Sequence, residues 1–203
     1  MNDRGPARLE AFSDGVFAIA ATLLTLEIGV DTTRGDLGGQ LTHIWPAYLA
    51  YVTTFLIIGV IWINHHHCVS LMRRVDRTFL FINLLLLLTV AFMPFPTRLV
   101  AQYLQKSGEQ DAVIAYAATM LLMACVYNVW WRYARTGRRL IGEDVPERTL
   151  SAVDRAFNPG VPSYAIVFAV AFVSPLASVV ITLGIAVFYL PSAALFERGG
   201  EPA

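Results

Sequence analysis

The chain has 203 residues, of which 56% are hydrophobic and only 15% are charged, and its mean hydropathy is +0.57. A soluble domain usually carries about 25% charged residues, so this composition excludes an ordinary soluble protein and predicts an integral membrane protein. The formal net charge is zero, which argues against a polyanionic partner such as nucleic acid.

Apolar runs of the length that a bilayer-spanning helix needs, about 20 residues, predict an all-α membrane fold with six transmembrane helices. In the third run, Pro94 and Pro96 are expected to kink or end the helix. The last apolar stretch is too long for one helix at the usual tilt, and Ser174-Pro175 near its middle favours a hairpin of two shorter helices over one long kinked helix. The helices of this single domain, residues 1–203, are expected at about residues 10–30, 44–68, 77–103, 111–136, 161–174 and 176–194.

Basic residues are distributed unevenly between the two ends of the predicted helices. With six helices, 12 of the 15 lysines and arginines fall on the side that holds both chain termini, and only Arg34, Arg98 and Lys106 fall on the other. Because basic loops stay in the cytoplasm, we expect both termini to be cytoplasmic. The chain is therefore expected to be a multi-pass protein of the cell inner (plasma) membrane.

The first predicted helix combines polar residues at its start with a long apolar stripe. At about 100° per residue, Ile19, Thr22, Leu23 and Leu26 share one face, and Asp14 points roughly the opposite way. A carboxylate near membrane depth needs a partner, and polar side chains of other helices are the expected ones: Trp62, Asn64, His65, His66, His67 and Asn83. The alternative is that Arg8 and Asp14 only mark the membrane interface.

The segment "RLEAFSD", Arg8 to Asp14, resembles the R-x-x-x-F-S-D signature of the transmembrane protein 175 family of potassium channels. The similarity continues through "FAIAATLLTLEI", "WINHH", "NLLLL" with the following "PFP", and the hairpin "FVSPLASVV". It covers most of the chain. Because the chain carries one six-helix unit, the resemblance implies a homotetramer like the bacterial members.

In that family the first helix lines a central pore, so the resemblance assigns roles to residues of this helix. Ile19 would form the narrowest hydrophobic ring, Leu23 and Leu26 would extend the constriction, and Thr22 would select potassium over sodium. Glu27 would concentrate cations at the outer mouth or be a solvated interface residue.

The motif residues themselves would fix the position of the first helix through other helices. The resemblance implies hydrogen bonds to polar groups of the second and third helices, for which Asn83 and, among three consecutive histidines, His66 are chosen. The expected network consists of Arg8, Phe12, Ser13, Asp14, His66 and Asn83.

The resemblance therefore implies a potassium-permeable, weakly selective cation channel in the lipid bilayer, passive and without a cofactor, whose constriction is both gate and filter. The alternative is a proton-coupled secondary transporter that uses Asp14 and a histidine of the second helix. Consecutive histidines on a helix point about 100° apart and cannot chelate one ion as an i, i+4 pair can, so we expect no metal site. The chain also lacks the motifs of an enzyme.

Overall fold

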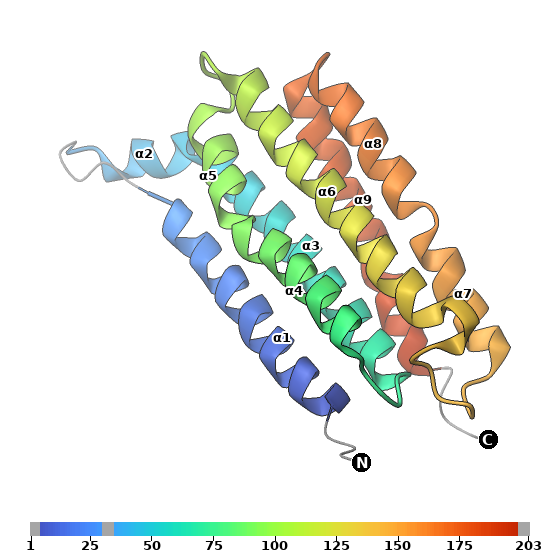
Figure 1. The fold of residues 1–203 in the computed structure, drawn as a ribbon. Coiled ribbons are helices and arrows are strands. Elements are labelled where there is room, and N and C mark those ends of the chain that lie inside the picture. Colours follow the sequence, from blue (N-terminus) through green and yellow to red (C-terminus); the bar gives the residue numbers. More distant parts are fainter. Residues whose placement is uncertain (1–4, 30–34, 199–203) are drawn as a thin grey trace.

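Long helices lying side by side make up the computed structural model of this chain (Figure 1). It describes the backbone of residues 5–29 and 35–198, and their side chains except those of Glu27 and residues 191–198. One isolated antiparallel bridge, between Met72 and Ile141, joins two loops of the described part. The helices are α1 (Gly5–Leu23), η1 (Leu24–Glu27), α2 (Leu37–His43), α3 (Trp45–Ser70), α4 (Arg77–Phe92), α5 (Pro94–Tyr103), α6 (Glu109–Arg135), η2 (Thr136–Arg138), α7 (Glu147–Phe157), α8 (Gly160–Ala171) and α9 (Pro175–Arg198).

Four helical stretches of the described residues are long and apolar enough to cross a membrane. They are Gly5–Leu26, Trp45–Ser70, Arg77–Tyr103 and Glu109–Arg138. The α8 helix has 12 residues, about 18 Å at 1.5 Å per residue, which is shorter than a hydrocarbon core of about 30 Å. It packs along α6, and α9 packs against α3 and α8.

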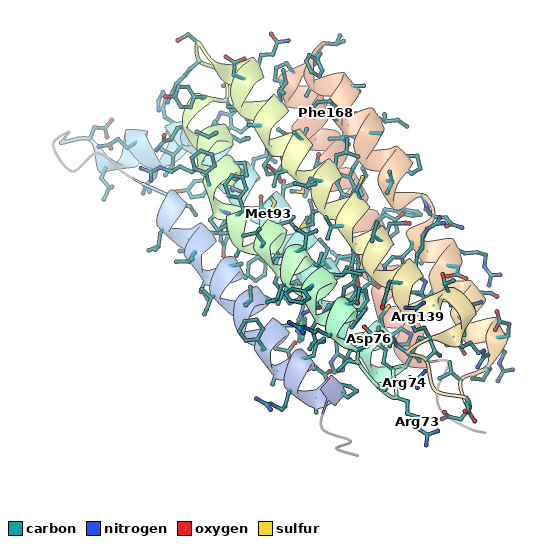
Figure 2. All side chains as sticks on the ribbon, in the orientation of Figure 1. Arg73, Arg74, Asp76, Met93, Arg139 and Phe168 are labelled. Carbon is teal, nitrogen blue, oxygen red and sulfur yellow. The ribbon has the colours of Figure 1, made fainter. Side chains whose placement is uncertain are left out.

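The third predicted helix is divided in the structure into α4 and α5, which meet at Met93. Pro94 follows this residue and cannot donate a backbone hydrogen bond. The hydroxyl of Thr97 donates to the Met93 carbonyl at 2.8 Å, and Thr54 Oγ1 lies 3.0 Å from both Thr97 Oγ1 and the Tyr116 hydroxyl. Buried hydroxyls from α3, α5 and α6 therefore surround the break, which lies midway along the bundle (Figure 2).

Two short helices lie outside the helices expected from the sequence. In α2, the Asp36 side chain accepts a hydrogen bond from Gly39 N at 3.0 Å, which caps the helix. The α7 helix buries Leu150 and Val153 while most of its other residues are polar. Neither helix has the long apolar run on which the sequence prediction relied.

The α1 helix lies at one edge of the bundle (Figure 1). It packs against α3 and α4, and to a lesser extent against α5. One face of α1 is buried by these neighbours, with Leu9, Ser13, Phe17 and Ala20 at helical spacing. Its opposite face is left uncovered by the described part of the chain.

Candidate functional site

The uncovered face of α1 and η1 carries large apolar side chains. Ile19 is 60% exposed and Leu26 is 75% exposed, and Phe12 and Leu23 are exposed beside them. In a water-soluble protein a contiguous apolar face of this kind marks an interaction surface. In a membrane protein it faces lipid, another subunit or a pore. The four positions predicted to line a pore, including Thr22, are all on this side of the helix.

Thr22 presents its hydroxyl oxygen on the same exposed face. Its Oγ1 lies 3.0 Å from the Ala18 carbonyl oxygen and 2.9 Å from the Ile19 carbonyl oxygen, so the hydroxyl hydrogen is directed to the helix backbone. A hydroxyl has one donor and two acceptor lone pairs. The lone pairs are therefore left to face outward, where they can accept a hydrogen bond or contact a cation.

The buried side of α1 is connected to three other helices through Asn83 of α4. The Asn83 amide donates to Ser13 Oγ at 3.1 Å, and Ser13 in turn donates to the Leu9 carbonyl at 2.8 Å. Asn83 Oδ1 accepts from Trp130 Nε1 on α6 at 2.9 Å and lies 3.0 Å from His65 Nε2 on α3. Because Oδ1 can only accept, His65 must carry a hydrogen on Nε2. We call Ser13, His65, Asn83 and Trp130 the Asn83 network.

The Asn83 network is buried and packed by aromatic rings. Ser13 and His65 have no exposed surface, and Asn83 is only 3% exposed. The His65 ring lies between Trp130, at a centroid distance of 4.9 Å, and Phe17 of α1, at 5.4 Å. A buried polar group without its partner is costly in a low-dielectric interior, so this network favours one rotation of α1 about its axis.

Consecutive residues on α3 point about 100° apart, so the three consecutive histidines have different neighbours. His65, and not His66, lies beside Asn83. His66 instead contacts α1 nearer its start, where its Nδ1 lies 2.6 Å from Glu10 Oε1.

Asp14 also joins α1 to α3, since its Oδ1 accepts from Trp62 Nε1 at 2.8 Å. Trp62 was one of the partners expected from the sequence. Asn64, another expected partner, contributes instead to a cavity on α3, α6, α7, α8 and α9.

The remaining predicted residues either take no part in the hydrogen bonds given above or have side chains that the structure does not describe. Arg8 and Phe12 are exposed on α1. The side chain of Glu27 lies outside the described residues. No group of three histidine, cysteine, aspartate or glutamate side chains comes close enough to hold a metal ion in the part of the chain that the structure describes.

Sequence reasoning missed Trp130, which lies within the fourth expected helix, residues 111–136. The residue has no exposed surface. A buried indole N–H normally finds a hydrogen-bond acceptor. The tryptophans in "YNVWWRY" were therefore the signal in the sequence that such an acceptor would be needed. Its neighbour Trp131 donates to Asp154 of α7 at 2.7 Å, and the pair thus connects α7 with the Asn83 network.

At the end of the bundle where α1 begins, charged residues connect neighbouring loops through hydrogen bonds. Asp76 caps α4 by accepting from Phe79 N at 2.8 Å, and its other oxygen accepts from the Tyr133 hydroxyl at 2.9 Å. Arg139 donates to that hydroxyl at 3.0 Å, and Arg74 Nε donates to the Arg139 carbonyl at 3.0 Å. Figure 2 shows Arg74, Asp76 and Arg139 gathered there. The α3–α4 and α6–α7 loops are thereby joined.

Comparison with known proteins identifies the family. Residues 8–94 match the family described as the endosomal/lysosomal potassium channel TMEM175. A protein of Streptomyces collinus named a potassium channel is 43% identical over 180 residues, covering 86% of this chain and 85% of that protein. A potassium channel of Chamaesiphon minutus is 40% identical over 186 residues, covering 90% of this chain and 92% of that protein.

A solved structure has the same fold. The crystal structure of a lysosomal potassium-selective channel TMEM175 homolog from Chamaesiphon minutus matches with a TM-score of 0.84 and 39% identity, covering 93% of this chain and 97% of that one. The residues of the family match run through α1, α3 and α4, which hold three members of the Asn83 network. The chain belongs to the TMEM175 family.

Proposed function

We propose that this chain is a potassium-permeable, weakly selective cation channel that assembles as a homotetramer around α1. The observation that carries the proposal is the geometry of α1, which is fixed on one side by the Asn83 network and leaves Ile19, Thr22, Leu23 and Leu26 uncovered on the other. The similarity to proteins named potassium channels supports potassium as the conducted ion.

In this proposal each subunit crosses the bilayer six times, with α4 and α5 together as the third span and α8 and α9 as the fifth and sixth. The short α8 is supported along its length by α6 and α9. The excess of basic residues that the sequence places on one side of the six spans supports a topology in which both termini lie in the cytoplasm. The chain would then be a multi-pass protein of the bacterial inner membrane.

Four copies of Ile19 around one axis form the narrowest part of the proposed pore. An apolar ring of small diameter expels water and blocks ions without any moving lid. Leu23 and Leu26 extend the apolar segment outward, and a rotation of α1 widens it. Because the Asn83 network favours one rotation, breaking that network is expected to change the population of the conducting state.

Thr22 is the proposed contributor to selectivity. Its hydroxyl hydrogen is held by the helix backbone, so four copies would direct oxygen lone pairs toward the axis, one turn outward from Ile19. Such a ring replaces part of the hydration shell of a cation. Glu27 at the outer mouth is proposed to raise the local concentration of cations.

The test is potassium flux through the purified protein in liposomes and single-channel recording in planar bilayers. Ile19→Asn should wet the ring and raise the basal current several-fold. Ile166→Asn on α8 is the matched control, because Ile166 is also 60% exposed but is assigned to the lipid-facing surface. Equal currents in both variants would show that Ile19 does not form the gate.

Selectivity is tested separately. Thr22→Ala should narrow the difference between potassium and sodium permeability, whereas Thr119→Ala, which removes a similar local hydroxyl–backbone bond on α6, should not. A flux that saturates at carrier rates and requires a proton gradient would instead establish the secondary-transporter alternative with Asp14 and an α3 histidine.

A further inference from the structure

A surface groove of about 340 Å³ lies at the end of α6, where the apolar part of this helix gives way to basic residues. Its lining consists of Val129, Arg132, Tyr133, Thr136 and Arg139. Two of these five residues are arginines and none is acidic. The groove is open to the surface, so a ligand can enter it without any movement of the helices.

The four arginines between residues 132 and 139 differ in their partners. Arg135 and Arg138 both form ion pairs with Glu147 at the start of α7. In the part of the chain that the structure describes, no carboxylate forms an ion pair with Arg132 or Arg139. The two arginines that line the groove are therefore the two whose charge the protein does not neutralise.

Neutral groups of the protein hold these two guanidinium groups in place. Arg132 Nε donates to Asn128 Oδ1 at 2.5 Å. Arg139 lies over the Tyr133 ring, with Cζ 4.8 Å from the ring centroid, and donates to the Tyr133 hydroxyl at 3.0 Å. A guanidinium has five N–H donors, and these hydrogen bonds use one from each arginine. Other donors of both side chains, and both positive charges, are left for a ligand.

The hydroxyl groups of the groove have already spent their hydrogens. The Tyr133 hydroxyl donates to Asp76, which does not line the groove, at 2.9 Å. The Thr136 hydroxyl donates to the Arg132 carbonyl at 2.7 Å. The donors that remain are guanidinium N–H groups, which match the oxygens of a phosphate through paired hydrogen bonds. The chemistry of the groove thus selects a phosphate-bearing anion.

An exposed apolar stripe of α6 leads into the groove. Leu122 and Val129 are each 55% exposed, and their spacing to Arg132 and Thr136 puts all four on one helix face. Leu122 precedes Arg132 by 10 residues, or about 15 Å at 1.5 Å per residue, which equals half of a hydrocarbon core of about 30 Å. A phospholipid contacts the arginines and this stripe together, whereas free phosphate contacts the arginines alone.

We propose that the groove binds the headgroup of an anionic phospholipid, with its phosphate between Arg132 and Arg139 and an acyl chain along Val129 and Leu122. Basic pockets beside membrane helices are known to bind such headgroups. Because the lining holds two arginines and no carboxylate, phosphatidylglycerol, with its net negative charge, should bind more tightly than zwitterionic phosphatidylcholine. The site does not depend on whether the protein conducts potassium.

Titration of the detergent-solubilised full chain with dioctanoyl phosphatidylglycerol, followed by native mass spectrometry, measures the affinity. Arg132→Gln should weaken binding of the first lipid about 5-fold, the value of one basic residue near an anionic surface. Arg148→Gln is the matched control, because it removes the same charge from an exposed side chain of α7 outside the groove, and it should leave the affinity unchanged. Equal weakening in both variants, or equal wild-type affinity for dioctanoyl phosphatidylcholine, would overturn the proposal.

Two further titrations use the same readout. Thr136→Glu adds a carboxylate beside both arginines at an exposed position and should also weaken binding about 5-fold; an unchanged affinity would refute the site even if Arg132→Gln failed to fold. Inorganic phosphate should displace the lipid only at a much higher concentration than the lipid itself. Displacement at an equal concentration would show a site for soluble phosphate and refute the phospholipid.

The position of the lipid is tested with crystals of the full chain grown with phosphatidylglycerol that carries bromine on one acyl chain, because bromine is located by its anomalous scattering. We expect a bromine peak beside Val129 and Leu122, and headgroup density between Arg132 and Arg139. Lipid bound elsewhere in wild-type crystals, with no headgroup in the groove, would overturn the proposal.

Discussion

Replacing Asn83 with leucine tests the physical basis of the Asn83 network. The substitution keeps a side chain of similar size but removes one donor and one acceptor from a buried position. It breaks the contacts of α4 with Ser13 of α1, His65 of α3 and Trp130 of α6. The N–H groups at His65 Nε2 and Trp130 Nε1 then lose the acceptor that Asn83 Oδ1 provides.

The expected loss follows from these three contacts. Hydrogen bonds between membrane helices are worth about 0.6 kcal/mol each on average, which gives roughly 2 kcal/mol for the set. Each buried donor left without an acceptor costs about 1–3 kcal/mol. For two such donors, the largest penalty is therefore roughly 6 kcal/mol. Partial repacking lowers the second figure, so we expect Asn83→Leu to reduce the free energy of unfolding by ~2–4 kcal/mol.

The measurement is unfolding in mixed detergent micelles, followed by near-ultraviolet circular dichroism, with thermal melting as a second probe. Thr119→Val is the control, because the Thr119 hydroxyl donates to the Ala115 carbonyl of its own helix, and the loss of this local bond should change the free energy of unfolding by less than about 0.5 kcal/mol. If Asn83→Leu unfolds with a free energy within 0.5 kcal/mol of the wild-type value, the network does not hold α1 in place.

Three further predictions concern other contacts. Trp62→Phe removes the bond to Asp14 and should lower the free energy of unfolding by about 0.5–1.5 kcal/mol; an unchanged value in detergent unfolding would show that water replaces the indole. Thr54→Val should cost about 1–2 kcal/mol in the same assay, because it breaks the buried hydroxyl cluster at the α4–α5 break. Hydrogen bonding from Arg138 lowers the pKa of Glu147, so this glutamate stabilises the fold above its unfolded pKa near 4.5 and ceases to do so as the pH falls through the lowered value. The melting temperature of Glu147→Gln should therefore fall less than that of the wild-type protein between about pH 5 and pH 3. An equal fall in both proteins would contradict the assignment.

The position of α1 explains how one helix can combine a stabilising role with the proposed conducting role. The residues that hold it and the residues proposed to line the pore are on opposite faces, separated by helical periodicity alone. Ser13 and Phe17 are buried, while Ile19 and Leu26 are exposed. Substitutions on the exposed face are therefore expected to change ion flux with little effect on the stability of the subunit.

Long apolar helices were predictable because a membrane imposes one strong pattern on the sequence. An unbroken apolar run of about 20 residues has few other structures available to it, and the stretches that become α3 and α6 follow this rule. The short α2 and α7 were missed because they contain no such run. The Pro94 break was expected, but the contact of Thr97 beside it with hydroxyls of α3 and α6 was not, because no local pattern connects these residues.

Sequence by itself determined that this protein is helical, that it belongs in a membrane, and that one face of its first helix is apolar while Asp14 points away from that face. Those properties follow from composition and from a period of 3.6 residues, which the chain carries locally. Only the tertiary structure decided that His65 rather than His66 meets Asn83, and that Trp130 completes the network. Helix rotation and register decide these contacts, and both are set by how side chains of four helices pack together, far apart along the chain.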